Sequence, residues 1–142
     1  MAELCAIPSP SRDEGRIAQV VRDILADLGA SVTEDDAGAA IPAGCGNIVA
    51  RFPATAPGRP VALCAHLDTV PNRGPIDVVV RDGYLTNADD DILGGDNKSA
   101  VAAVIEAVRK SERPVLASWI GEQDLPDAAQ EVFLSQEAHQ RL

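Results

Sequence analysis

The sequence has few aromatic residues, few basic residues and no long apolar run. Aromatic side chains make up 3% of its 142 residues, so Ala, Val, Leu and Ile must build the core. Lys and Arg number 12 against 22 Asp and Glu, and the net charge of -10, without a stripe of Lys and Arg, argues against a surface that neutralises nucleic-acid phosphates. No run approaches the roughly 18 apolar residues that span a bilayer, and the N-terminus lacks a signal-peptide pattern. We therefore expect a cytoplasmic protein without a nucleic-acid or membrane partner.

Cysteine is scarce as well, at three residues that form no CxxC pair. An odd number of widely spaced cysteines argues against a disulfide framework and against a thiolate zinc site. The sequence shows no internal repeat, and its length is that of one domain.

The segment 9–30 predicts an amphipathic helix with its own start and stop signals. Ser11 and Glu14 have the spacing of a capping box, and Gly29 follows the last apolar residue. The apolar stripe between them consists of Ile17, Val20, Val21, Ile24, Leu25 and Leu28.

Strand-like and helix-like segments alternate along the rest of the chain. Residues 31–36 predict a short edge strand, 47–53 a second strand, and 59–70 an apolar strand buried on both faces. Asp82-Gly83 within 76–87 predicts a hairpin turn. A helix with a stripe of Val101, Val104, Ile105 and Val108 follows, then a strand in 113–123 and a terminal helix in 124–142. The alternation favours an α/β sandwich with a mostly parallel or mixed sheet.

The segment LCAHLDTVP, residues 63–71, holds the first group of candidate site residues. Side chains alternate along a strand, so Cys64, His66 and Asp68 share one face. A carboxylate beside an imidazole can orient the ring for a zinc ion. From this pair alone, a strand-end histidine that is hydrogen-bonded to its neighbour is the preferred interpretation. For Cys64 we predict a small apolar core residue rather than a thiolate ligand.

The segment DDDILGGDNKSA, residues 89–100, holds the second group. Asp96 follows a Gly-Gly pair at a junction between loop and helix. It could be a helix N-terminal residue beside a solvated acidic loop. A phosphate cradle is disfavoured because the segment is acidic and lacks Walker spacing. The third interpretation is an oxygen ligand that a tight glycine turn directs at a metal.

Several of these segments together resemble a known family. IPSPSRDEGRIAQVVRDILADLG, GNIVARFP, ALCAHLDTVP, VVVRDGYLTN and ILGGDNKSAVAAVIEAV are similar, in order and spacing, to the N-terminal part of the catalytic domain of the zinc aminopeptidase/carboxypeptidase family. This family includes peptidase T, carboxypeptidase G and several amino-acid deacylases. The closest likeness is to the peptidase T-like branch, tripeptide aminopeptidases among them, and it covers about residues 4 to 110.

The resemblance implies a fold and a metal centre. The fold would be a three-layer α/β sandwich with a mixed, mostly parallel sheet, incomplete at its C-terminal side. His66 matches a ligand of one zinc in a two-zinc centre, Asp68 the aspartate that orients it, and Asp96 the carboxylate that bridges both metals. In such a centre zinc acidifies the bridging water and polarises the scissile carbonyl, and cobalt or manganese are alternative metals.

The likeness fails where the family has a Glu-Glu pair, the first residue its general base and the second a zinc ligand. This chain offers Glu122 followed by Gln123, and Gln130-Glu131 further on. Glu122 is the better candidate for the base because an apolar segment precedes it, although a surface glutamate is the commoner role. His139 lacks the glycine-rich setting of the family's C-terminal histidine.

The resemblance and the point at which it fails predict one partial catalytic domain over 1–142. This domain would be family-like over 1–113 and divergent over 114–142. The predicted function is zinc-dependent hydrolysis of peptide bonds in short peptides with a free amino terminus, with little turnover by this chain alone. The alternative is a non-catalytic binding or assembly module that keeps the peptidase fold. An unpaired sheet edge would favour its self-association.

Overall fold

The computed structural model describes residues 1–53, 61–110 and 115–119. The predicted terminal helix, Glu122, Gln130-Glu131 and His139 lie outside these residues. The helices are α1 (Ala2–Cys5), α2 (Gly15–Asp27), α3 (Ala37–Ala40) and α4 (Gly95–Lys110). The strands are β1 (Ser31–Glu34), β2 (Ile48–Arg51), β3 (Val61–Ala65), β4 (Val78–Arg81), β5 (Tyr84–Asn87) and β6 (Val115–Trp119). Among the described residues, none of the helices has the length and apolar character of a membrane span.

Four strands form the main sheet in the order β1-β2-β6-β3. β2 pairs antiparallel with both β1 and β6, and β3 pairs parallel with β6. The predicted mixed sheet is confirmed, and β1 is an edge strand of the described sheet as predicted. Of the three strand pairings in the described sheet, two are antiparallel and one is parallel, so this part of the sheet is not mostly parallel.

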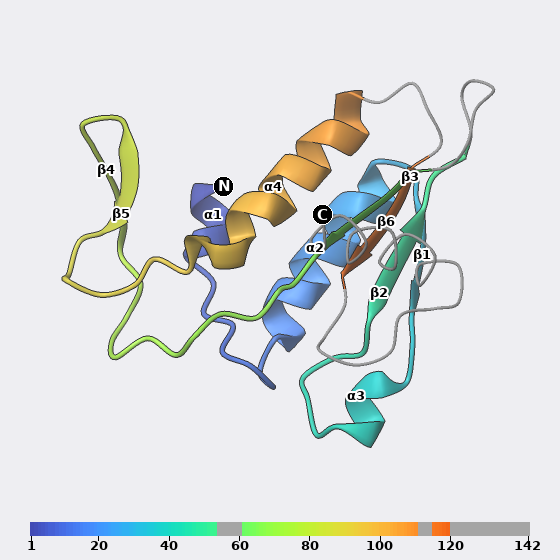
Figure 1. The fold of residues 1–142 in the computed structure, drawn as a ribbon, viewed down its shortest axis with the longest axis horizontal. Helices are drawn as coiled ribbons and strands as arrows, with labels where there is room; N and C mark the ends of the chain where they lie inside the picture. Colours follow the sequence, from blue (N-terminus) through green and yellow to red (C-terminus); the bar gives the residue numbers. More distant parts are fainter. Residues whose placement is uncertain (54–60, 111–114, 120–142) are drawn as a thin grey trace, which may run out of the picture.

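Both long helices cover one face of this sheet (Figure 1). α2 contacts β1 and β2, while α4 contacts β3 and α1. The predicted stripes are the buried faces of these helices, because Ile17, Val21 and Leu25 are fully buried, as is Val101. They meet Ile48 and Ala50 of β2 in one apolar cluster. The described residues thus supply a sheet and one helical layer, and a third layer stays a prediction.

The β4–β5 hairpin projects away from the main sheet (Figure 1). Asp82 and Gly83 both have positive φ, 51° and 82°, which is the backbone of a tight two-residue hairpin turn. The predicted hairpin is confirmed.

Two predictions about local packing are wrong. β3 is not buried on both faces, since Val61 is 46% exposed and Cys64 is exposed. Cys64 alternates with the core residues Leu63 and Ala65, so it lies on the face of the sheet that neither long helix covers. Val61 is the first residue of a strand at the edge of the described sheet. The capping box does not form either, because α2 begins at Gly15 without a side-chain cap. Glu14 instead accepts a hydrogen bond from the Arg12 backbone at 2.6 Å.

Candidate metal site

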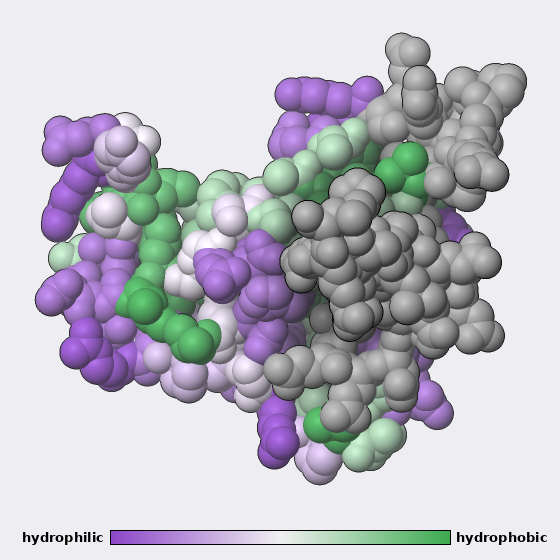
Figure 2. Space-filling view, viewed as in Figure 1, coloured by the Kyte–Doolittle hydropathy of each residue, from purple (hydrophilic) through white to green (hydrophobic). Residues whose placement is uncertain are grey.

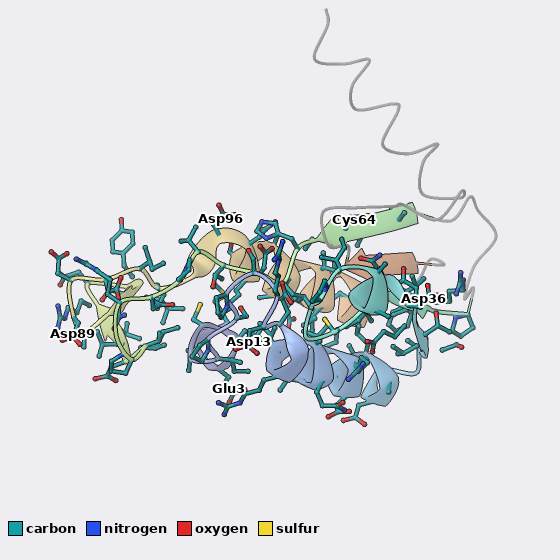
Figure 3. The ribbon with its side chains drawn as sticks, turned by 90° about the horizontal axis from the view of Figure 1, so that it is seen from below. Glu3, Asp13, Asp36, Cys64, Asp89 and Asp96 are labelled. Carbon is teal, nitrogen blue, oxygen red and sulfur yellow. The ribbon has the colours of Figure 1, made fainter. Side chains whose placement is uncertain are left out.

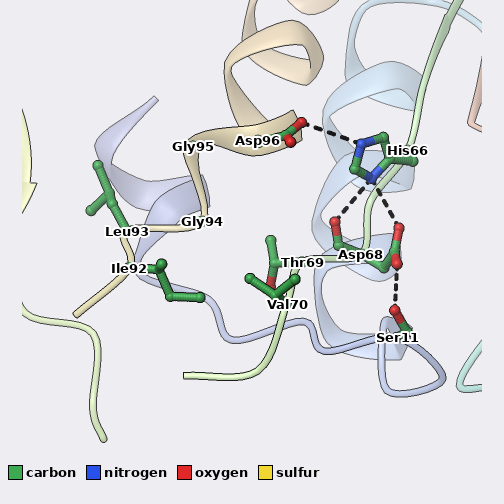
Figure 4. Close-up of a pocket in the computed structure, with 10 residues that line it drawn as sticks. All are labelled: Ser11, His66, Asp68, Thr69, Val70, Ile92, Leu93, Gly94, Gly95 and Asp96. Carbon is green, nitrogen blue, oxygen red and sulfur yellow. Dashed lines mark hydrogen bonds and ion pairs between the residues drawn. The ribbon is translucent and has the colours of Figure 1, made fainter. Parts of the chain in front are cut away.

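The candidate site lies where the chain leaves β3 and where α4 begins. β3 ends at Ala65, so His66 and Asp68 stand just beyond the sheet. Asp96 belongs to the first turn of α4 but has non-helical dihedral angles, φ -92° and ψ 105°. Gly94, two residues before Asp96, has φ 74°, a backbone conformation that favours glycine. This backbone places the Asp96 carboxylate beside the end of β3 (Figure 4).

His66 and Asp68 form a hydrogen-bonded pair. His66 Nδ1 lies 2.9 Å from Asp68 Oδ1 and 3.0 Å from the Asp68 backbone oxygen. Both of these partners accept hydrogen bonds, so Nδ1 must be the nitrogen that carries the proton. In the neutral ring, Nε2 is then left with a free lone pair.

The lone pair of His66 faces Asp96. Nε2 lies 3.5 Å from Asp96 Oδ1, and the Asp96 side chain is 95% exposed. This separation exceeds the usual 2.7–3.2 Å of an N–H···O hydrogen bond. With a neutral ring, two acceptor atoms face each other at this distance, which is an arrangement that a bound cation would satisfy, whereas a protonated ring would form an ion pair with Asp96.

The two atoms also have the spacing of zinc ligands. Two ligands at about 2.0–2.1 Å from one tetrahedral zinc lie about 3.3 Å apart. His66 Nε2 and Asp96 Oδ1, at 3.5 Å, are close to that value. Imidazole nitrogen and carboxylate oxygen are both common zinc donors. Within residues 1–53, 61–110 and 115–119, no group of three or more His, Cys, Asp or Glu side chains is placed to hold a metal ion.

These side chains line a pocket of about 280 Å³. Its polar wall includes Ser11, His66, Asp68 and Asp96, and its apolar wall includes Val70, Ile92 and Leu93. Val70 and Ile92 are exposed, and a hydrophobic strip separates the hairpin from the body of the molecule in Figure 2. The pocket thus offers charge on one side and an apolar surface on the other.

A carboxylate fixes the loop that carries the apolar wall. Asp91 accepts backbone hydrogen bonds from Ile92 at 2.8 Å, from Arg73 at 2.7 Å and from Gly74 at 3.3 Å. The hydrogen bond from Ile92, followed by that from Arg73, lowers the pKa of Asp91. Ionised Asp91 therefore ties the segment after β3 to the segment before α4.

Lys98 lies behind the site, and its position was not predicted. Its side chain is fully buried, and Nζ donates a hydrogen bond to the Ile7 backbone oxygen. Burial lowers the pKa of the Lys98 ammonium, and the Cys5 thiol offsets this only in part. Helical spacing offered a signal, because Lys98 stands at i−3 and i−7 from the buried Val101 and Ile105.

The remaining candidates do not join the site. Cys64 is exposed, so its predicted core position is wrong, and it does not line the pocket. Figure 3 shows Cys64 well separated from Asp96, which also removes it as a ligand in this arrangement. It lies on the face of β3 opposite to the core residues Leu63 and Ala65, which explains the exposure. Glu122 lies outside the described residues, so its predicted role is untested.

Comparisons with known proteins point to peptidases. No protein-family model matches the chain. It is 33% identical over 107 residues to the uncharacterized protein YqjE of Bacillus subtilis, covering 75% of this chain and 29% of that protein. It is 32% identical over 117 residues to the cytosol non-specific dipeptidase of Escherichia coli, covering 73% of this chain and 22% of that protein.

A solved structure gives the same result for the fold. The crystal structure of aminopeptidase PepT from Bacillus cereus is similar with a TM-score of 0.77 and 31% identity. This similarity covers 82% of this chain and 33% of that one. The chain therefore spans between about a fifth and a third of the length of these proteins.

Proposed function

We propose that this chain belongs to the PepT-like peptidase family, and that His66, Asp68 and Asp96 form part of a metal centre for the hydrolysis of short peptides. The observation that carries this proposal is the 3.5 Å separation of His66 Nε2 and Asp96 Oδ1, two acceptors that face each other. The similarity to an aminopeptidase and to a dipeptidase supports peptide bonds as the target.

His66 and Asp96 would hold the metal, and zinc suits their nitrogen and oxygen donors. Cobalt and manganese are alternatives. When bound, the metal would supply a Lewis acid for the peptide carbonyl and would lower the pKa of a water molecule.

The chain's own residues would prepare this chemistry. Asp68 holds the proton on His66 Nδ1, which keeps the Nε2 lone pair available. Asp96 brings negative charge to the rim of the pocket. Val70 and Ile92 would exclude water and contact an apolar side chain of the peptide. For Glu122 we keep the role of general base as a proposal.

Peptide hydrolysis requires more than the two metal ligands and the pocket wall proposed for this chain. Because the chain spans about a third of PepT or less, we propose that it contributes two metal ligands and one pocket wall, and that it has little turnover alone. The substrate we favour is a short peptide with a free amino terminus, since aminopeptidases and dipeptidases act on such peptides.

Cobalt spectroscopy tests this proposal without requiring turnover. We expect the visible absorption of cobalt to rise and shift when it binds the chain, and to change again when a tripeptide is added. Asp96→Asn should abolish both changes. Asp89→Asn, an exposed carboxylate of the same acidic segment, is the matched control and should retain both. Equal spectra for wild type and Asp96→Asn would contradict the proposal.

A second candidate function rests on the sheet edge. β3 lies at one edge of the described sheet, and its Val61 is 46% exposed. Such an edge can pair with another chain, so the protein would act as an assembly module. Sedimentation should then show mass that rises with concentration, and Val61→Lys should suppress this rise. A constant monomer mass would remove this candidate.

A further inference from the structure

Ser11 makes a contact that the capping-box pattern did not predict. Its Oγ donates a hydrogen bond to Asp68 Oδ2 at 2.5 Å, and its side chain lines the pocket. The other oxygen of the same carboxylate faces His66 Nδ1 at 2.9 Å. Figure 4 shows the three side chains in a row, from Ser11 through Asp68 to His66.

The Asp68 carboxylate has little else to hold it among the contacts described. It stands beyond the end of β3, and its side chain is 36% exposed. A partly exposed carboxylate can rotate between rotamers and exchange its partners with water. A hydroxyl on Oδ2 limits this rotation and leaves Oδ1 for His66. Because the acceptor is charged, this hydrogen bond is stronger than one between neutral groups.

The backbone that carries Ser11 is fixed against the same strand end. Ser9 is fully buried, and its Oγ donates to the Leu67 backbone oxygen at 2.9 Å. The Thr69 backbone N–H donates to the Ser9 oxygen at 2.8 Å, and Pro10 forms a parallel bridge with Thr69. Ser9 is thus hydrogen-bonded to Leu67 and Thr69, the two neighbours of Asp68. These bonds restrict the backbone next to Ser11 and keep its hydroxyl close to the Asp68 carboxylate.

Lys98 holds the start of the same segment. Its buried ammonium donates to the Ile7 oxygen, which links the N-terminal segment to the first turn of α4. Since Asp96 lies two residues before Lys98, one strap of residues 7–11 contacts both chain segments that carry the site. Ser11 is the only residue of that strap whose side chain lines the pocket in the described structure.

We infer that Ser11 is a positioning residue of the metal centre. By holding the Asp68 carboxylate, it acts together with the Asp68 backbone oxygen to keep the His66 proton on Nδ1 and the Nε2 lone pair directed at Asp96. This inference rests on the proposed function for its metal-binding consequence. The effect on the His66 tautomer does not, because it needs only the hydrogen bonds of the metal-free chain.

Nitrogen-15 NMR of the imidazole rings measures the tautomer directly. The chain has two histidines, so His139→Gln identifies the signals of His66. At a pH where the ring is neutral, we expect the Nδ1–H tautomer to predominate in the wild type. Ser11→Ala should raise the share of the Nε2–H tautomer several-fold. Ser11→Thr keeps the hydroxyl and should restore the wild-type ratio. Ser31→Ala, at an exposed serine of β1, is the matched control.

Zinc titration of the same variants gives the second readout. Loss of groups that orient a ligand typically costs 10–100-fold in metal affinity, and Ser11 acts one residue further away, so we expect a roughly 3–10-fold weaker affinity in Ser11→Ala. Ser11→Thr should recover it.

The outcomes separate the two claims. Ser11→Ala with an unchanged tautomer ratio would overturn the inference, even if zinc binding requires Asp96. A shifted tautomer in a chain that binds no zinc would support Ser11 as the positioning residue of His66 and overturn the proposed metal centre. If Ser11→Ala unfolds the chain, Ser11→Cys, a much weaker donor of similar size, replaces it and should shift the ratio in the same direction.

Discussion

Gly94→Ala should destabilise the chain by an amount that the structure allows us to estimate. Gly94 has φ 74°, and a left-handed conformation costs a residue with a Cβ about 1–2 kcal/mol. An added Cβ would also lie 3.1 Å from Thr69 Cγ2 and 3.4 Å from Lys98 Nζ. Thr69 is 4% exposed and Lys98 fully buried, so neither can move away freely. The crowding adds about 1 kcal/mol, at the lower end of overpacking costs.

The expected loss is therefore about 2–3 kcal/mol in the free energy of unfolding. For a chain of this length it corresponds to a Tm lower by about 6–12 °C. Chemical denaturation followed by circular dichroism measures it. Gly95→Ala is the matched control, because nothing lies within 4 Å of its added Cβ and its φ is not positive. We expect Gly95→Ala to stay within about 0.5 kcal/mol of wild type.

A double mutant separates the two contributions. Thr69→Ser removes the crowding methyl group and keeps the hydroxyl that donates to the Ser9 oxygen at 3.3 Å. In this background Gly94→Ala should cost up to about 1 kcal/mol less, because the tightest contact of the added Cβ, that with Thr69 Cγ2, is gone. A Gly94→Ala chain as stable as Gly95→Ala would refute the estimate and the turn geometry on which the position of Asp96 depends.

Two further predictions concern charged groups near the site. The pKa of Asp91 is lowered from 3.8 in the folded chain, so its stabilising effect is present above this value and is lost as the pH falls through the lowered pKa. Asp91→Asn should be less stable than wild type at pH 7, and the gap should close in acid; an equal gap at all pH values would contradict this. The pKa of Lys98 is lowered from 10.5, so the unfolded chain binds more protons between the lowered pKa and 10.5. Wild type should gain stability relative to Lys98→Met as the pH rises towards 10.5 in urea titrations, and a falling difference would show that the buried ammonium is not penalised.

The structural elements that are determined by residues close together in the sequence could be predicted. Asp82-Gly83 sets the hairpin because both residues tolerate positive φ. The stripe around Ile17 and Leu25 marks the buried face of α2 because burial on one face repeats with the helical period.

The errors occurred where a distant partner decides. Ser11 has the spacing of a cap, but a carboxylate 57 residues away takes its hydroxyl. Cys64 lies in an apolar run that is typical of a buried strand, yet the described helices cover only the opposite face of β3. Neither the distant partner of Ser11 nor the uncovered face at Cys64 can be predicted from the residues that surround these positions.

The candidate site was predicted only in part for the same reason. The resemblance indicated His66, Asp68 and Asp96, and the structure brings these three together, while their metal-binding roles remain predictions. The contributions of Ser11 and Lys98 depend on the strap of residues 7–11, whose path over the end of β3 has no local signature. Helical spacing alone could have indicated that Lys98 is buried.

Zinc binding by titration calorimetry tests the central claim most directly. The purified chain should bind zinc, and both His66→Ala and Asp96→Ala should abolish the binding, while Asp89→Ala should leave it unchanged. Zinc affinity that is indifferent to Asp96, or equally sensitive to Asp89, would mean that the acidic surface binds the metal without a defined site. The peptidase fold would then serve a function other than metal-dependent hydrolysis in this chain.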